Sequence, residues 1–89
     1  MNKFTNRAQR ENLGLKKCGS DQLPVKRRGE TWAGRGCGPR CSLCDRTIKP
    51  GEVEYEWRAN TQDGRESLLF HLTCFQSWSF VSARLREAC

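Results

Sequence analysis

Two short motifs, CSLC at residues 41–44 and HLTC at residues 71–74, contain four side chains that can bind a metal ion. A tetrahedral zinc ion takes four thiolate or imidazole ligands, and two such pairs supply all of them. A full set of protein ligands leaves no position for a substrate, which is typical of structural zinc. The sequence therefore predicts one structural zinc ion as cofactor, bound by Cys41, Cys44, His71 and Cys74.

Three other cysteines leave alternatives open. Cys37 lies four residues before Cys41 and is the main competitor for one of the ligand positions. Copper and iron–sulfur sites also use cysteine, but a single histidine beside three cysteines favours zinc. Cys18 and Cys89 have no nearby partner in the sequence, and we expect both to be free thiols.

Six cysteines are also compatible with a disulfide scaffold. The first 17 residues contain no apolar run of the kind found in a signal peptide, so we expect an intracellular, not secreted, protein with reduced cysteines. No stretch approaches the roughly 18–20 apolar residues of a membrane span, and no membrane partner is expected. A chain of 89 residues buries little apolar surface, so a bound metal would supply much of its folding free energy.

The positive charge is confined to one part of the chain. Residues 1–35 contain nine lysines and arginines against three acids, whereas residues 36–89 contain seven of each. We therefore predict a basic, flexible arm over residues 1–35 and a zinc-finger domain over residues 36–89. The arm contains the candidate residues for contacts with nucleic-acid phosphates and bases: Lys16, Lys17, Lys26, Arg27, Arg28, Trp32 and Arg35.

The first half of the predicted domain reads as a turn followed by a hairpin. Residues 36–46, called the knuckle below, would place the first two cysteines on a tight turn, with Asp45 at a positive φ. Residues 53–57 alternate apolar and acidic side chains, which predicts a half-buried strand. Asp63-Gly64 predicts a hairpin turn to a second strand at residues 67–70.

The second half reads as a helix. Apolar side chains after His71 recur at helical spacing, with His71 and Cys74 on the first turn: Cys74, Trp78, Val81 and Leu85. The arm shows little periodicity, although a short helix within residues 2–15 would be compatible with its sequence. The predicted fold class is a small zinc-stabilised α+β fold: a treble-clef-like finger (knuckle, β-hairpin, C-terminal helix) preceded by a largely irregular basic arm.

The stretch CSLCDRTIKPGEVEYEWRANTQDGRESLLFHLTCF resembles the poly(ADP-ribose) polymerase-type zinc finger, a module that recognises DNA breaks. Its ligand plan is also similar to that of LIM-type half-domains. Two DNA-reading residues of the polymerase-type finger have no counterpart, because Glu54 and Gln62 replace a phosphate-binding arginine and a base-stacking aromatic residue. The resemblance therefore implies the scaffold and the zinc but not break sensing. The positions that match the pattern of that finger are Cys41, Cys44, Ile48, His71, Cys74 and Phe75.

Catalysis is not expected, because the only histidine is a predicted zinc ligand and no small-molecule substrate is implied. Two binding hypotheses remain. The first is a protein that binds nucleic acid, DNA or RNA, through the basic arm. The alternative is a protein-interaction module, a small adaptor or inhibitor of a larger complex, which docks through the finger or its acidic strand face. That face consists of Glu52, Glu54 and Glu56.

Overall fold

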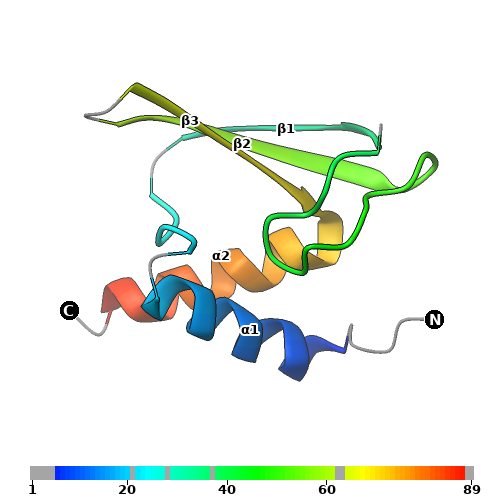
Figure 1. Cartoon of the computed structure of the whole chain (residues 1–89). Coiled ribbons are helices and arrows are strands. Elements are labelled where there is room, and N and C mark those ends of the chain that lie inside the picture. The colour runs from blue at the N-terminus through cyan, green and yellow to red at the C-terminus, as the bar shows by residue number, and fades with distance from the viewer. Residues whose placement is uncertain (1–5, 21, 28, 37, 62–63, 88–89) are drawn as a thin grey trace.

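The computed structural model describes residues 6–20, 22–27, 29–36, 38–61 and 64–87. In them the chain forms α1 (Arg7–Gly19), β1 (Glu30–Arg35), β2 (Val53–Thr61), β3 (Gly64–His71) and α2 (Leu72–Glu87). The strands form one antiparallel sheet in the order β1-β2-β3. Figure 1 shows both helices on one side of the sheet, with the knuckle close to the junction of β3 and α2. The small α+β class is thus confirmed, whereas the treble-clef assignment stays a prediction.

The core is centred on Trp78 of α2. Its ring stacks on Phe70 of β3 with 4.7 Å between ring centroids, and it meets Trp57 of β2 edge-on at 5.2 Å. All three rings are buried, and such aromatic pairs stabilise a core beyond their buried area. The predicted apolar stripe of α2 is confirmed, because Cys74, Trp78 and Val81 are buried and Leu85 packs against the core.

The predicted hairpin is also present. β2 and β3 pair from Glu54 opposite His71 to Thr61 opposite Gly64, so the second strand is longer than the predicted residues 67–70. The predicted turn residue Asp63 lies outside the described residues.

The expectation of a largely irregular arm is wrong for α1 and β1. A capping box starts α1: the Asn6 side chain accepts a hydrogen bond from the Gln9 amide, and the Gln9 side chain accepts one from the Asn6 amide. β1 is ordered by antiparallel pairing with β2 over its whole length. Neither a cap nor a backbone ladder requires apolar periodicity, so the sequence pattern indicated the helix only as compatible with residues 2–15 and did not reveal β1.

The helix α1 packs along α2, and both run in the same direction. Gly14 lies at the contact, where a Cβ atom would stand 3.4 Å from the Cγ2 atom of Val81. One turn earlier, the Arg10 guanidinium donates through Nε to the Ser77 hydroxyl at 3.2 Å. Neither helix, within the described residues, is long and apolar enough to cross a membrane.

The segment between α1 and β1 is held by α2. The Trp78 indole donates to the Pro24 carbonyl at 2.9 Å, and the Lys26 amide donates to the Ser82 hydroxyl at 2.7 Å. Leu23 is buried in the core. Contacts therefore cross the predicted boundary between residues 35 and 36 in several places, while the flexibility predicted for the arm stays a prediction.

The glycine at the helix contact gives a first prediction. Gly14→Leu should lower the free energy of unfolding by about 1–3 kcal/mol, since the added side chain must push α1 away from Val81. Gly19→Leu is the matched control, because nothing lies within 4 Å of the position of its Cβ. Chemical denaturation of both variants measures the difference. Equal stabilities would show that α1 is not docked as described.

Candidate metal centre

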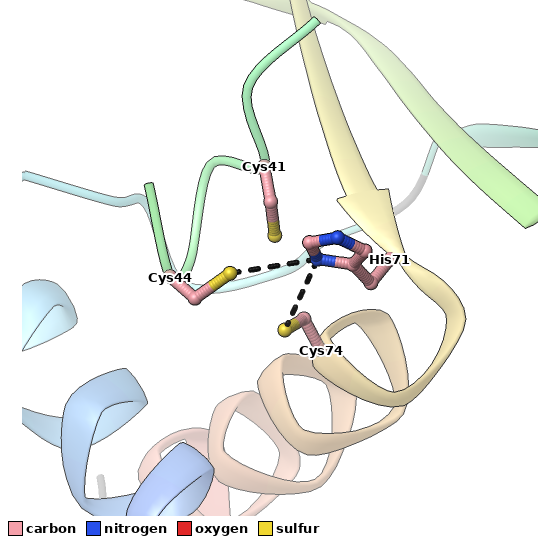
Figure 2. Close-up of side chains that lie close together, drawn as sticks. All are labelled: Cys41, Cys44, His71 and Cys74. Carbon is pink, nitrogen blue, oxygen red and sulfur yellow. Dashed lines mark hydrogen bonds between the residues drawn. The ribbon is translucent and has the colours of Figure 1, made fainter. Parts of the chain in front are cut away.

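The four predicted ligands converge on one point. Figure 2 shows the sulfur atoms of Cys41 and Cys44 from the knuckle and of Cys74 from α2 around the imidazole of His71. All four ligand atoms lie within 4.8 Å of one another. Cys41 and Cys74 are buried, and the other two side chains are half-buried. His71 is the last residue of β3, so only Cys74 lies on the first helical turn where both were expected.

The spacing of these atoms fits a tetrahedral zinc ion. Bonds of about 2.0–2.1 Å to nitrogen and about 2.3 Å to sulfur place the two ligand atoms about 3.6 Å apart in a tetrahedron. The Nδ1 atom of His71 lies 3.4 Å from the Cys44 sulfur and 3.8 Å from the Cys74 sulfur. Three thiols and one imidazole are also a donor set that zinc prefers. The cluster can therefore hold one metal ion.

The surroundings of His71 select which ring nitrogen faces the cluster. The Nε2 atom lies 3.2 Å from the carbonyl oxygen of Thr47, which can only accept a hydrogen bond. The carboxylate of Glu52 lies 3.5 Å from the same nitrogen. Nε2 therefore carries the proton of the neutral ring and donates it, which leaves the lone pair of Nδ1 directed at the sulfur atoms.

The three cysteine side chains are joined by hydrogen bonds. Hydrogen bonds from the thiols of Cys44 and Cys74 lower the pKa of Cys41 far below its ordinary value. The hydrogen bond to Cys41 is also the main cause that raises the pKa of Cys44 and of Cys74, because each of them keeps its proton as the donor. A bound cation would stabilise the thiolate form of these ligands.

Backbone hydrogen bonds shape the knuckle around its two cysteines. The Asp45 amide donates to the Cys41 carbonyl at 2.9 Å, and the Cys41 amide donates to the Arg46 carbonyl at 2.9 Å. Asp45 takes the predicted left-handed conformation, with φ at 64°. Ser42 then fixes the knuckle to β3, because its amide donates to the Leu69 carbonyl at 2.7 Å and its hydroxyl accepts from the Leu69 amide at 3.3 Å.

Lys17 of α1 also holds the knuckle. Its ammonium group lies 2.8 Å from the Asp45 carboxylate and donates to the Ser42 carbonyl at 3.1 Å. Only 10% of the Lys17 side chain is exposed. Lys17 was predicted as a nucleic-acid contact, but the structure places its charge inside the molecule. Its position on α1 gave no sign of this role, because the partner lies 28 residues further along the chain.

Of the other predicted nucleic-acid contacts, Lys16 lines a cleft that also contains Cys44 and Cys74. Lys16, Arg27, Trp32 and Arg35 are exposed, and Lys26 is half-buried. Arg28 lies outside the described residues, as do Cys37, the alternative ligand, and Cys89. Cys18 is a buried free thiol next to the Pro24 carbonyl, and burial raises its pKa. None of the four described cysteines forms a disulfide.

Comparisons with known proteins assign no family. A scan against protein-family models finds no match to the chain, and searches of curated proteins and of solved structures find no significant match. The resemblance to the polymerase-type finger thus rests on the matching sequence positions alone, and the function must be argued from the residues.

The geometry predicts that folding depends on the metal. Structural zinc contributes roughly 10–16 kcal/mol of apparent binding free energy in small finger domains, so a strong chelator should unfold the chain. Cys44→Ser and His71→Ala should have the same effect, whereas Cys18→Ser should keep the metal, because Cys18 lies outside the cluster. Metal content by mass spectrometry and amide spectra measure these outcomes. A chelated protein with a native amide spectrum would contradict the prediction.

A second prediction concerns Glu52. Glu52→Ala removes the carboxylate beside His71 and should weaken metal affinity by up to about tenfold, since second-shell partners orient a ligating histidine. The Thr47 carbonyl remains, so binding itself should persist. Glu56→Ala is the matched control, because its carboxylate pairs with Arg58 on the same strand. Competition titration with a chromophoric chelator compares the affinities, and equal values for both variants would remove Glu52 from the metal centre.

Proposed function

We propose that this protein is a non-enzymatic zinc protein that binds nucleic acid through cations of its first 35 residues. The observation that carries the proposal is the charge split. The whole surplus of positive charge belongs to residues 1–35, and Lys16, Lys26, Arg27 and Arg35 of that segment are exposed or half-buried. Cations at a protein surface release the counterions of a nucleic acid and bind its phosphates with little regard to sequence.

The metal has a structural role in this proposal. The four side chains of the Cys3His cluster would fill all four positions around a tetrahedral zinc ion. The cluster also joins the knuckle to the junction of β3 and α2. The only histidine of the chain belongs to that cluster, so no second imidazole is available as a general base. The zinc would therefore hold the shape of the surface rather than take part in a reaction.

Trp32 adds a surface for stacking. Its side chain is 46% exposed on β1, and the Arg58 guanidinium lies 4.7 Å from the ring centroid. Trp57 and Trp78 are buried. An exposed indole beside an arginine suits the unpaired bases of a single strand, which stack on aromatic rings. Quenching of tryptophan emission upon binding would come mainly from Trp32.

The test uses charge removal, because α1 and the segment before β1 pack against the core and a deletion of residues 1–35 would disturb the fold. The triple variant Lys16→Gln, Lys26→Gln, Arg27→Gln should lower the slope of log affinity against log salt by about 2 for single strands. The matched control removes three cations outside the segment: Arg40→Gln, Lys49→Gln and Arg86→Gln. Fluorescence anisotropy with a labelled single-stranded oligonucleotide measures both.

Two results would contradict the proposal. One is the absence of binding by the native protein at low salt. The other is an equal loss of slope in the control variant, which would mean that the cations of residues 1–35 have no special part in binding.

A second candidate function is supported by the outer sheet face, defined here as the face directed away from α2. Side chains alternate between the two faces of a strand. Trp57 contacts Trp78 of α2, so the even-numbered residues of β2 and their partners on β1 face outward. That face presents Trp32 together with Glu30, Glu54, Glu56 and Arg58, and its acidic balance would repel phosphate but suit a basic protein segment. Binding of a polylysine peptide that is lost upon Glu30→Gln, Glu54→Gln, Glu56→Gln would favour this function.

A further inference from the structure

A second aromatic ring is exposed on the other side of the molecule, where the sequence suggested no site. Phe80 follows Trp78 by two residues, which places it roughly on the opposite side of α2 from the sheet. Its side chain is 40% exposed. A single exposed phenylalanine is common on protein surfaces. Whether Phe80 marks a binding surface therefore depends on the residues around it.

The neighbours of Phe80 are arginines from two helices. The guanidinium carbon of Arg7 on α1 lies 5.4 Å from the ring centroid, and that of Arg84 on α2 lies 5.7 Å from it. Both distances are within the range of cation–π attraction. The ring remains 40% exposed, so the two cations do not cover it completely. The packing of α1 along α2 therefore places one arginine from each helix beside the ring.

A cleft of about 160 Å3 adjoins the ring. It is lined by Arg7, Arg10, Glu11, Gln76, Ser77 and Phe80. Arg7 pairs with Glu11 at 2.7 Å, and Arg10 donates through Nε to the Ser77 hydroxyl. These contacts hold the two guanidinium groups at the edge of the cleft. With Arg84 included, three arginines and one glutamate lie beside the ring or line its cleft, and the balance of charge is positive.

We propose that Phe80, Arg7 and Arg84 form a binding surface for single-stranded nucleic acid, in which a base stacks on the ring and the arginines contact the flanking phosphates. The proposal rests on the proposed function, since it places a contact of that same activity on the paired helices. Charge complementarity supports this occupant, because Arg7 and Arg10 belong to the segment that carries the whole charge surplus. An exposed ring between cations is the combination that single-strand binding proteins use.

The experiment compares Phe80 variants of the full zinc-loaded chain by anisotropy with a labelled single-stranded oligonucleotide. Phe80→Leu keeps an apolar side chain but removes the ring, and it should weaken binding by roughly 5- to 100-fold. Phe80→Tyr keeps the ring and should bind within about twofold of the native protein, because stacking needs only the π face. Zinc content and thermal unfolding confirm that each variant is folded.

Arginine variants give an independent readout. Arg84→Gln should lower the slope of log affinity against log salt by about 0.7, the value for one phosphate contact on a single strand. Arg86→Gln is the matched control on the same helix, and the slope should not change, because Arg86 lies about 200° around α2 from Arg84.

The outcomes separate this inference from the proposed function. Phe80→Leu that binds as tightly as the native protein, or equal slopes for Arg84→Gln and Arg86→Gln, would overturn the inference. If those variants bind normally while the Lys16, Lys26, Arg27 triple variant loses affinity, the proposed function stands without this surface. A native protein that binds no oligonucleotide overturns both.

Discussion

Three cysteine sulfurs and one imidazole nitrogen within 4.8 Å of one another are the constraint on which the structure depends. The knuckle, β3 and α2 each bring ligands to this point, so the cluster fixes how these three segments meet. Such a cluster is stable only when charge is balanced. Three ionised thiols would repel one another, and three protonated thiols offer few good hydrogen bonds. A bound cation would offset the repulsion between thiolates and take the place of the missing hydrogen bonds. The distances from His71 Nδ1 to the sulfur atoms of Cys44 and Cys74 match those around a zinc ion.

Contacts outside the metal cluster also hold the knuckle in place. Lys17 reaches from α1 to Asp45 and Ser42, so the helix of the basic segment braces the knuckle directly. α1 in turn stays in place through Gly14, whose lack of a side chain allows close approach to Val81. The predicted arm and the predicted domain thus share one set of contacts. Substitutions that displace α1 should therefore also disturb the knuckle.

The parts of the structure that the sequence revealed are those with side-chain patterns. Ligand spacing predicted the cluster, residues 53–57 predicted β2, and the stripe through Trp78 predicted α2. α1 was only weakly indicated and β1 was not predicted, for physical reasons. The buried residues of α1 are Gly14, Lys17 and Cys18, which do not form an apolar stripe, and all six residues of β1 are exposed. β1 joins the sheet through backbone hydrogen bonds, which many sequences can make.

The same limit applies to the candidate site. Thr47 contributes a backbone carbonyl, which has no sequence signature, and Glu52 looked like part of a solvated strand face. The long-range pair of Lys17 and Asp45 was equally hidden, because nothing in a single sequence links positions 28 residues apart. A sequence can thus reveal the ligands of a metal, whereas the groups that orient them become visible only once the chain is folded.

The fold also converts a charge split along the chain into a charge split across its layers. β1 adds Glu30 to a sheet face that already has Glu54 and Glu56, while α1 brings Arg7 and Arg10 beside Phe80 and Arg84 of α2. Arg58 offsets one of these acids, so the sheet face is acidic on balance whereas the helix surface around Phe80 is basic. A polyanion that approaches the protein would be oriented by this field with the helices toward it, and a basic segment would be oriented the other way. Trp32 lies on the acidic face, so the two candidate functions would share that ring, and only the surface around Phe80 is separate from it.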